Sequence, residues 1–466
     1  MEQFELDRKI LRFNGEHPYT IRDSCEGVLI TGGIGSGKTS GSGATFARAF
    51  LEAGFGGLVL CAKKDELETW IQYAKETARE DSLLIFDGSG NNCFPFLDYE
   101  INREGEGAGL TENIVRLFMT VHEVIGRKSG GGDSYWVNAM QQLMRNTVDL
   151  AMISQNTVSV PLMYDIVQSA PRHPDEVVSK EWREASMCYH LLDKGNKKEK
   201  DRWTQYDYDS TASYFLEEFP HISEKTRSGI ISMFTTTLDL FMRKPFRMLF
   251  SESPDESTQI AYPELTHHGA VIVMHLPVKE FGESGRAAQV IYKLLWQQAA
   301  ERRDIKKNSR PIFLWADEAQ NFVTDYDMHF QATARSSRAC TVYLTQNLPN
   351  FFTELGNHDR THSLVGNLQT KIFHANSDPE TNTYASEVIG RSWHDHQGKS
   401  QSLGDSSFSM GQSSNESFDY DVPPQVFTRL PKGGPHYNKT VGAIVFQNGR
   451  TWANDKTYLY ANFKQI

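Results

Sequence analysis

A glycine-rich segment near the start of the chain has the sequence Gly32-Gly33-Ile34-Gly35-Ser36-Gly37-Lys38-Thr39. It follows the apolar run Val28–Thr31, which has the composition of a buried strand, and it precedes residues 44–51, in which apolar side chains recur with helical spacing. The order strand, glycine loop, helix, with the spacing G-x-x-x-x-G-K-T, is the context that a phosphate-binding P-loop requires. The segment therefore predicts a nucleotide-binding domain of the α/β class.

Each residue type in this loop has a physical role in binding ATP. Glycines allow positive φ and a close backbone approach, so that several N–H groups point at the phosphates, and the next helix adds the partial positive charge of its N-terminus. Lys38 is expected to reach the β- and γ-phosphates, and the Thr39 hydroxyl is expected to bind Mg²⁺. The predicted nucleotide-binding residues are Gly32, Gly33, Ile34, Gly35, Ser36, Gly37, Lys38, Thr39 and Ser40.

A second motif supplies the groups that hydrolysis needs. The apolar run 312–316 ends in two adjacent carboxylates, Asp317 and Glu318. Asp317 is expected at the carboxyl end of a strand, where it holds Mg²⁺ directly or through water, and Glu318 is expected to polarise the attacking water. Because the two motifs depend on each other, the sequence predicts a P-loop ATPase rather than a protein that only binds phosphate.

A third set of residues surrounds the next apolar run, 341–345. Gln346 ends this run, which should form the strand beside that of Asp317, and it is expected to hydrogen-bond the γ-phosphate or the water. Arg335 and Arg338 are expected on a helix before the strand. Each is either an ordinary surface arginine or an arginine finger that reaches the ATP of a neighbouring subunit, and such a finger raises the rate by ~10³–10⁵.

The periodicity of apolar residues changes twice along the chain. Residues 1–101 and 244–466 contain apolar runs that alternate with helical segments, which is typical of a parallel sheet covered on both faces. Residues 102–243 are dominated by helical spacing. We therefore expect a discontinuous nucleotide-binding domain with an all-α insertion. Residues 398–420, rich in serine and glycine, are expected to form a flexible loop or hairpin.

Composition narrows the class of protein. The chain has 466 residues, five scattered cysteines without a C-x-x-C pair, and a net charge of −11. The cysteine pattern predicts neither zinc nor disulfides and fits a reducing compartment. The acidic balance argues against a broadly basic surface but leaves room for a local basic channel. With no signal peptide and no uncharged apolar run of ~18 residues, we expect a cytoplasmic protein without a membrane span.

Taken together, the motifs resemble the conjugative coupling proteins of type IV secretion, of the TraG and TraD type, within the FtsK–HerA class of translocases. The stretches that carry the resemblance are the P-loop, residues 314–318, residues 334–338 with 345–346, and residues 364–372. The resemblance implies a RecA-like P-loop domain with an inserted all-α domain, and a homo-hexameric ring with ATP at each subunit boundary. It makes Arg335 a finger acting in trans and places Lys371 on a strand near the γ-phosphate, ranked below Arg335.

The resemblance also implies a function. We expect an ATP-dependent motor that recruits and moves DNA, or a relaxase–DNA complex, through contacts to phosphates that are independent of sequence. Typical coupling proteins begin with two membrane helices, which this sequence lacks, so the expected route to the inner membrane and the secretion channel is through a partner. Two alternatives stay open: a substrate-docking receptor whose assembly ATP controls, with the helical insertion as the partner surface, and a soluble HerA-like DNA-processing ATPase outside conjugation.

Overall fold

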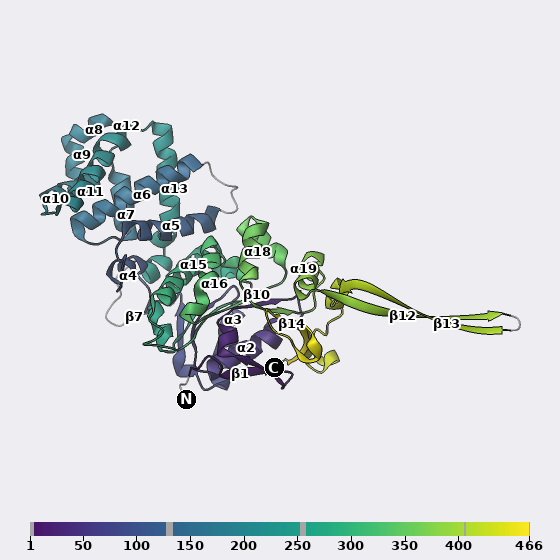
Figure 1. Ribbon diagram of the computed structural model, residues 1–466. Helices are drawn as coiled ribbons and strands as arrows, with labels where there is room; N and C mark the ends of the chain where they lie inside the picture. Colours follow the sequence, from purple (N-terminus) through teal and green to yellow (C-terminus); the bar gives the residue numbers. More distant parts are fainter. Residues whose placement is uncertain (1–3, 127–133, 252–257, 405–406, 466) are drawn as a thin grey trace. The chain divides into compact units, whose positions relative to one another are not determined.

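The computed structural model describes residues 4–126, 134–251, 258–404 and 407–465. The chain forms two compact units, each assembled from segments that are distant in the sequence (Figure 1). The first unit holds Met1–Gly57, Ile71–Asp81 and Ile305–Ile466, and the second holds Leu58–Trp70 and Ser82–Asp304. The P-loop and the acidic pair after residue 316 both belong to the first unit, so the candidate site is described within it.

The first unit contains the strand that precedes the P-loop. Its strands, in spatial order, are β15 (Tyr458–Lys464), β14 (Thr440–Gln447), β11 (Thr370–Phe373), β3 (Val28–Thr31), β10 (Ala339–Thr345) and β9 (Ile312–Ala316). From β11 to β9 all pairs are parallel, whereas β14 is antiparallel to both of its neighbours. The parallel strands are buried along their whole length, which accounts for their near-continuous apolar sequences. The strands predicted before the P-loop, before Asp317 and before Gln346 are confirmed.

Helices and a small hairpin complete the first unit. They are β1 (Lys9–Phe13), β2 (His17–Thr20), α1 (Ile21–Ser24), α2 (Ala44–Glu52), the end of α3 (Asp65–Glu76), α16 (Asp325–Thr333), α17 (Leu348–Leu355), α18 (His358–Gly366), α19 (Pro379–Ile389) and α20 (Pro424–Phe427). Helix α2 buries Phe46 and Phe50, which lie one turn apart on the same face. The Phe46 ring lies 5.2 Å from Tyr19 and the Phe50 ring lies 5.7 Å from Phe313. This aromatic cluster fixes the helix that follows the P-loop against the sheet.

In the second unit, β5 (Leu83–Asp87) pairs in parallel with β8 (Val271–His275), and β4 (Gly56–Leu60), whose residues are divided between the units, stands next to β8 in the strand order. The long helix α15 (Val278–Arg302) packs here through fully buried Gln289. The Gln289 amide accepts from the N–H of Cys61 (2.8 Å) and donates to the carbonyls of Cys61 (3.0 Å) and Leu276 (2.7 Å). One side chain therefore satisfies backbone groups on two segments.

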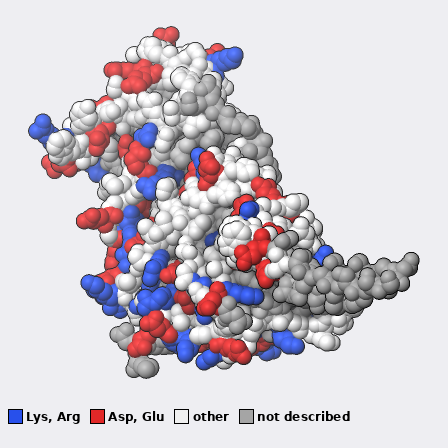
Figure 2. Space-filling view, turned by 45° about the vertical axis from the view of Figure 1, so that its right-hand side comes forward, with Lys and Arg blue, Asp and Glu red and all other residues white. Residues whose placement is uncertain are grey.

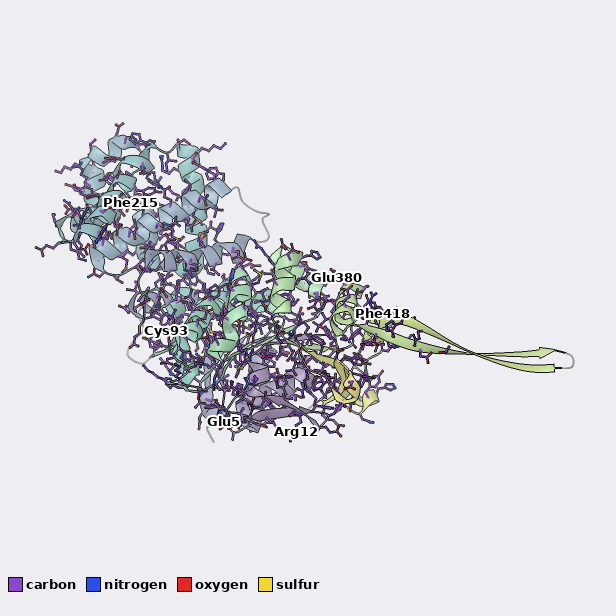
Figure 3. The ribbon with its side chains drawn as sticks, viewed as in Figure 1. Glu5, Arg12, Cys93, Phe215, Glu380 and Phe418 are labelled. Atoms are coloured by element: carbon purple, nitrogen blue, oxygen red, sulfur yellow. The ribbon has the colours of Figure 1, made fainter. Side chains whose placement is uncertain are left out.

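The rest of the second unit is mainly helical. Its helices are α4 (Phe96–Asn102), α5 (Thr111–Gly126), α6 (Ser134–Gln155), α7 (Val160–Ser169), α8 (Pro174–Val178), α9 (Lys180–Ala185), α10 (Met187–Lys197), α11 (Arg202–Ser213), α12 (Phe219–His221), α13 (Glu224–Met242) and α14 (Phe246–Phe250). Phe215, seen among these helices in Figure 3, is fully buried. The described part of 102–243 contains helices and no strand, but the second unit also includes β5, β8 and α15, so the domain boundaries at 101 and 243 stay a prediction. Among the described residues, no helix has the length and apolar content to cross a bilayer.

The serine- and glycine-rich stretch 398–420 lies in a two-stranded antiparallel hairpin. Strand β12 (Arg391–Gly404) pairs with β13 (Ser407–Tyr420) over its full length, and residues 405–406 lie outside the described part of the chain. Near the base of the hairpin, Trp393 stands opposite Phe418 with their rings 5.5 Å apart. Figure 3 labels Phe418. Of the loop and the hairpin expected from sequence, the backbone adopts the hairpin.

Candidate active site

The phosphate loop between β3 and the next helix requires glycine at two positions. Gly35 and Gly37 have φ of +69° and +81°, the left-handed region that favours glycine. A Cβ added at Gly37 would also lie 2.5 Å from Cγ2 of Val441, whereas Gly35 faces open space. The side chain of Ile34, at the tip of the loop, is 84% exposed. The loop is thus closed on the side of β14 and open on the side where Gly35 lies.

We predict that Gly37→Ala lowers the free energy of unfolding more than Gly35→Ala does. Both variants force an L side chain into left-handed backbone, at ~1–2 kcal/mol each, but only the change at position 37 also meets Val441. Chemical denaturation of the two variants and the wild type, with the slopes compared to verify a common unfolding reaction, measures the difference. Equal losses of stability would mean that Val441 moves aside.

The helix after the loop begins with a π-helical turn, η1 (Thr39–Gly43), and becomes regular at α2. The N–H of Gly43 donates to the carbonyl of Lys38 at 2.8 Å, an i to i+5 bond. Sequence spacing predicted a helix here but not its π geometry. Such turns are frequent at functional sites because they redirect side chains by a fraction of a turn.

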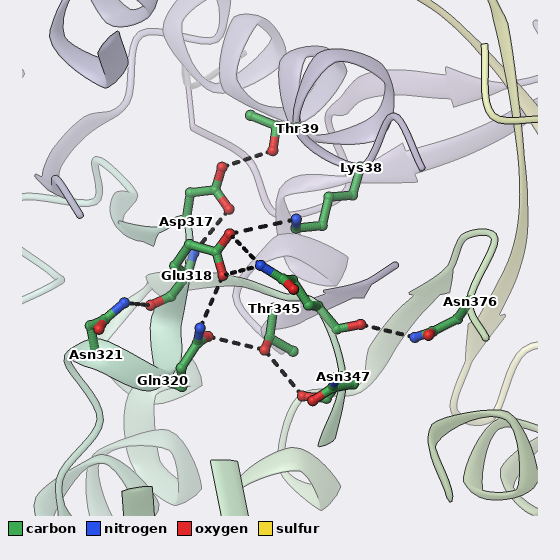
Figure 4. A network of polar contacts seen from close by, with 10 residues as sticks. Lys38, Thr39, Asp317, Glu318, Gln320, Asn321, Thr345, Asn347 and Asn376 are labelled. Atoms are coloured by element: carbon green, nitrogen blue, oxygen red, sulfur yellow. Dashed lines mark hydrogen bonds and ion pairs between the residues drawn. The ribbon is translucent and has the colours of Figure 1, made fainter. Parts of the chain in front are cut away.

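Two oxygen atoms that can bind a metal ion lie close together where the phosphate loop meets Asp317 and Glu318 (Figure 4). The Thr39 hydroxyl donates to Oδ2 of Asp317 at 2.7 Å, and the other Asp317 oxygen accepts from the N–H of Glu318 at 2.9 Å. Asp317 is 3% exposed and directly follows β9. A hydroxyl and a carboxylate are hard ligands of the kind that Mg²⁺ prefers, so the pair fits the metal predicted from sequence.

Lys38 and Glu318 form a second buried pair beside the first. Nζ of Lys38 lies 3.8 Å from Oε1 of Glu318, and both side chains are more than nine-tenths buried. Charges in such a place are stable only when paired. Glu318 has left-handed backbone with φ of 54°, which is uncommon for a non-glycine residue and clusters at functional sites.

Gln346 lies beside Glu318, because β10 pairs with β9 and both strands end at the same edge. Its Nε2 donates to both oxygens of Glu318, at 3.2 and 3.4 Å. Gln320 donates to the same carboxylate at 2.9 Å and accepts from the Thr345 hydroxyl at 3.0 Å. The side chains of Lys38, Thr39, Asp317, Glu318 and Gln346 are therefore brought together, as Figure 4 shows for the network around Glu318.

The two candidate arginines lie elsewhere. They precede β10, whose seven residues span about 20 Å, so neither reaches the P-loop of its own chain. Arg335 is exposed and lies 3.4 Å from Oε1 of Glu26. Arg338 donates to the carbonyls of Phe4 (2.8 Å) and Ser309 (2.7 Å) and has left-handed backbone. These bonds give Arg338 a structural role, whereas the side chain of Arg335 is largely exposed.

Two further predicted site residues point away from the cluster. Lys371 is buried and donates to the carbonyl of Leu368 at 2.6 Å, and burial lowers its pKa to about 8. The hydroxyl of Ser40 accepts from Nε2 of Gln465 at 2.9 Å. Both side chains therefore have partners within the chain, and the Ser40 hydroxyl, which is the acceptor in its bond, keeps its own hydrogen to donate to a phosphate.

The sequence motifs do not include Gln320, His374 or Asn376. Gln320 orients Glu318, and Asn376 donates to the backbone carbonyl of Gln346 at 2.9 Å. His374 and Asn376 directly follow β11, the strand beside β3. Polar residues placed at the carboxyl end of an apolar strand were the available signal, since in parallel sheets such ends meet at one edge.

No curated protein matches the sequence. The unbound monoclinic form of the bacterial conjugative coupling protein TrwBdeltaN70 aligns with a TM-score of 0.63 at 13% identity, covering 99% of this chain and 90% of that one. TrwB in complex with ADP and Mg²⁺ gives 0.61 at 12%, covering 99% and 91%, and TrwB with the ATP analogue ADPNP gives 0.60 at 14%, covering 99% and 94%. These matches show the fold, a RecA-like P-loop domain with an inserted helical domain.

The family profile described as type IV secretory system conjugative DNA transfer matches residues 5–426. The match covers the P-loop, the acidic pair, Gln346 and the helices between them. The fold likeness to a conjugative coupling protein agrees with it. The chain therefore belongs to the conjugative DNA transfer family of type IV secretion systems, the coupling proteins.

Proposed function

We propose that this chain is a P-loop ATPase that uses ATP to recruit and move DNA during conjugative transfer. The observation that carries the proposal is the convergence of Lys38, Thr39, Asp317 and Glu318 at the ends of β3 and β9. A glycine loop with left-handed positions stands beside them. Solved TrwB structures in complex with ADP and Mg²⁺ and with an ATP analogue support a nucleotide as the ligand.

Each residue of the site has its own role in the proposed reaction. Thr39 and Asp317 would hold Mg²⁺, because their oxygens already lie 2.7 Å apart. When bound, the ion offsets the negative charge of the phosphates. Lys38 and the backbone N–H groups of the loop would bind the β- and γ-phosphates. Glu318 would accept a proton from the attacking water, and the amide of Gln346 donates to that carboxylate and orients it.

We further propose that the site is completed by a second copy of the chain. Arg335 is exposed and stands at the amino end of β10, the opposite edge from the P-loop. An arginine at this place serves a neighbour's ATP rather than its own. Repeated around a closed ring, the arrangement is compatible with the homo-hexamer that the family resemblance implies, with each subunit supplying a P-loop on one side and Arg335 on the other.

DNA contacts should be made mostly to phosphates. On the face drawn in Figure 2, lysine and arginine are interspersed with aspartate and glutamate over the described residues. Such a face does not bind DNA as a broad positive field would, so we place the DNA contacts in the lining of the ring, where local positive charge suffices. Attachment to the inner membrane would come through a partner protein, and a relaxase and channel proteins are the partners that conjugation implies.

A docking receptor is the second candidate function. The exposed aromatic residues Trp203 and Tyr206, each 73% exposed, lie three positions apart on α11. Aromatic side chains are enriched at protein interfaces. In this reading ATP controls assembly, and the helical region 102–243 binds a protein substrate.

Displacement of streptavidin from biotinylated DNA separates the two functions. A motor should displace streptavidin from single- or double-stranded DNA only when ATP is present, and Lys38→Ala should abolish the displacement. A receptor should bind its partner with the same variant and displace nothing. Wild-type protein that turns over ATP without moving along either DNA would contradict the motor and favour the receptor.

A further inference from the structure

The segment after β11 contacts three separate parts of the candidate site. The N–H of His374 donates to the carbonyl of Thr31 at 2.8 Å, and the carbonyl of Ala375 accepts from the N–H of Gly33 at 2.9 Å. Asn376 donates to the backbone carbonyl of Gln346 at 2.9 Å. These bonds join β11 to the start of the phosphate loop and to the glutamine beside Glu318.

The side chain of His374 adds a contact to the far end of the loop. It is fully buried, with Nε2 2.7 Å from the hydroxyl of Ser42 and Nδ1 3.1 Å from the carbonyl of Gly442 in β14. A carbonyl can only accept, so Nδ1 carries the hydrogen and Nε2 accepts from Ser42. Burial lowers the pKa of His374 to about 4, which keeps this neutral tautomer at physiological pH.

Ser42 lies in the π turn that carries Thr39, and its hydroxyl is also 3.3 Å from the carbonyl of Lys38. Close packing around the hydrogen bond between Ser42 and His374 restricts the movement of the phosphate loop. A Cβ at Gly32 would lie 2.8 Å from Cβ of His374, and Val441, next to Gly442, packs against Gly37. The phosphate loop is thus enclosed by β11 on one side and β14 on the other.

We propose that His374 is a positioning residue for ATP hydrolysis, whose neutral imidazole ties the first turn after the phosphate loop to β14. This hydrogen bond keeps the turn that presents Lys38 and Thr39 in a fixed position relative to the segment after β11. That segment in turn binds the backbone of Gln346 through Asn376. The antiparallel strands at the carboxyl end of the chain are then part of the nucleotide site. The proposal rests on the ATPase function proposed above.

The test combines His374→Phe, which keeps a planar ring without nitrogen, with Ser42→Ala, which removes one hydroxyl. Each variant should lower kcat by ~10–100-fold, the cost of displacing a catalytic group by about 1 Å, with little change in KM. The double variant should be no worse than the more severe single one, because both remove the same bond. Tyr343→Phe is the control, since it removes the buried hydroxyl contact to Asp327 (2.6 Å) and should cost stability without lowering kcat.

A folded His374→Phe protein with unchanged kcat would overturn the proposal, and so would losses that multiply in the double variant. If His374→Phe does not fold, Ser42→Ala decides alone by the same criterion. If the wild type turns over no ATP, the proposed function fails, and the tie is tested through release of a fluorescent ADP bound with Mg²⁺. Faster release from both variants supports it, and unchanged release contradicts it.

Discussion

Glu318→Gln should lower ATP turnover by ~10²–10⁴, the contribution of a general base, while nucleotide binding is nearly unchanged. The amide keeps the shape of the carboxylate but cannot accept a proton from water. The carboxylate lies beside Lys38 of the phosphate loop, and two glutamines donate to it and fix its orientation. Steady-state turnover and binding of a fluorescent ADP with Mg²⁺ measure the two effects separately.

Glu76→Gln provides the matched control. Glu76 lies on α3 in the same unit, and its carboxylate binds Arg48 and Gln72 rather than a residue of the Lys38 cluster. This variant should retain wild-type turnover. If Glu318→Gln stays within about tenfold of the wild type, Glu318 is not the general base, and a group supplied by another subunit becomes the candidate.

Arg335→Ala should lower turnover by ~10³–10⁵, the contribution of an arginine finger acting in trans. The exposed position of Arg335 at the edge of the sheet opposite the P-loop is the structural reason to expect an effect only in assembled rings. Mixing Arg335→Ala with Lys38→Ala provides the sharpest test. One variant keeps a working P-loop and the other a working arginine, so mixed rings should recover activity that neither variant has alone.

Arg338→Ala separates this role from a structural one. Arg338 holds the carbonyls of Phe4 and Ser309, so its loss should reduce stability, and mixing with Lys38→Ala should restore nothing beyond the residual activity. Recovery of activity with Arg338→Ala, and none with Arg335→Ala, would reverse the assignment of the finger.

The sequence predicts those parts of the site whose backbone conformation depends only on the residues of the segment itself. The P-loop spacing requires a glycine at position 37, where left-handed backbone occurs, and the apolar runs before Asp317 and Gln346 form the expected strands. Because strands that end at one edge bring their next residues together, the approach of Gln346 to Glu318 also follows once the two strands are neighbours.

The sequence alone does not predict the directions of these side chains or the contacts between segments that are distant in the chain. Lys371 lies on the predicted strand, but the register of β11 turns its amine toward the carbonyl of Leu368. Arg338 donates to the carbonyl of Phe4, which lies near the N-terminus and far away in sequence. The tie of His374 depends on β14 returning antiparallel beside β11, a pairing that periodicity within one strand does not specify.

DNA-stimulated ATP turnover, measured over a range of salt concentrations, tests the central claim most directly. We predict that DNA raises the turnover of the wild type, that the stimulation falls steeply as salt increases because the contacts are to phosphates, and that Lys38→Ala has no turnover with or without DNA. ATP turnover that is the same with and without DNA at every salt concentration would contradict the claim that this site drives DNA movement.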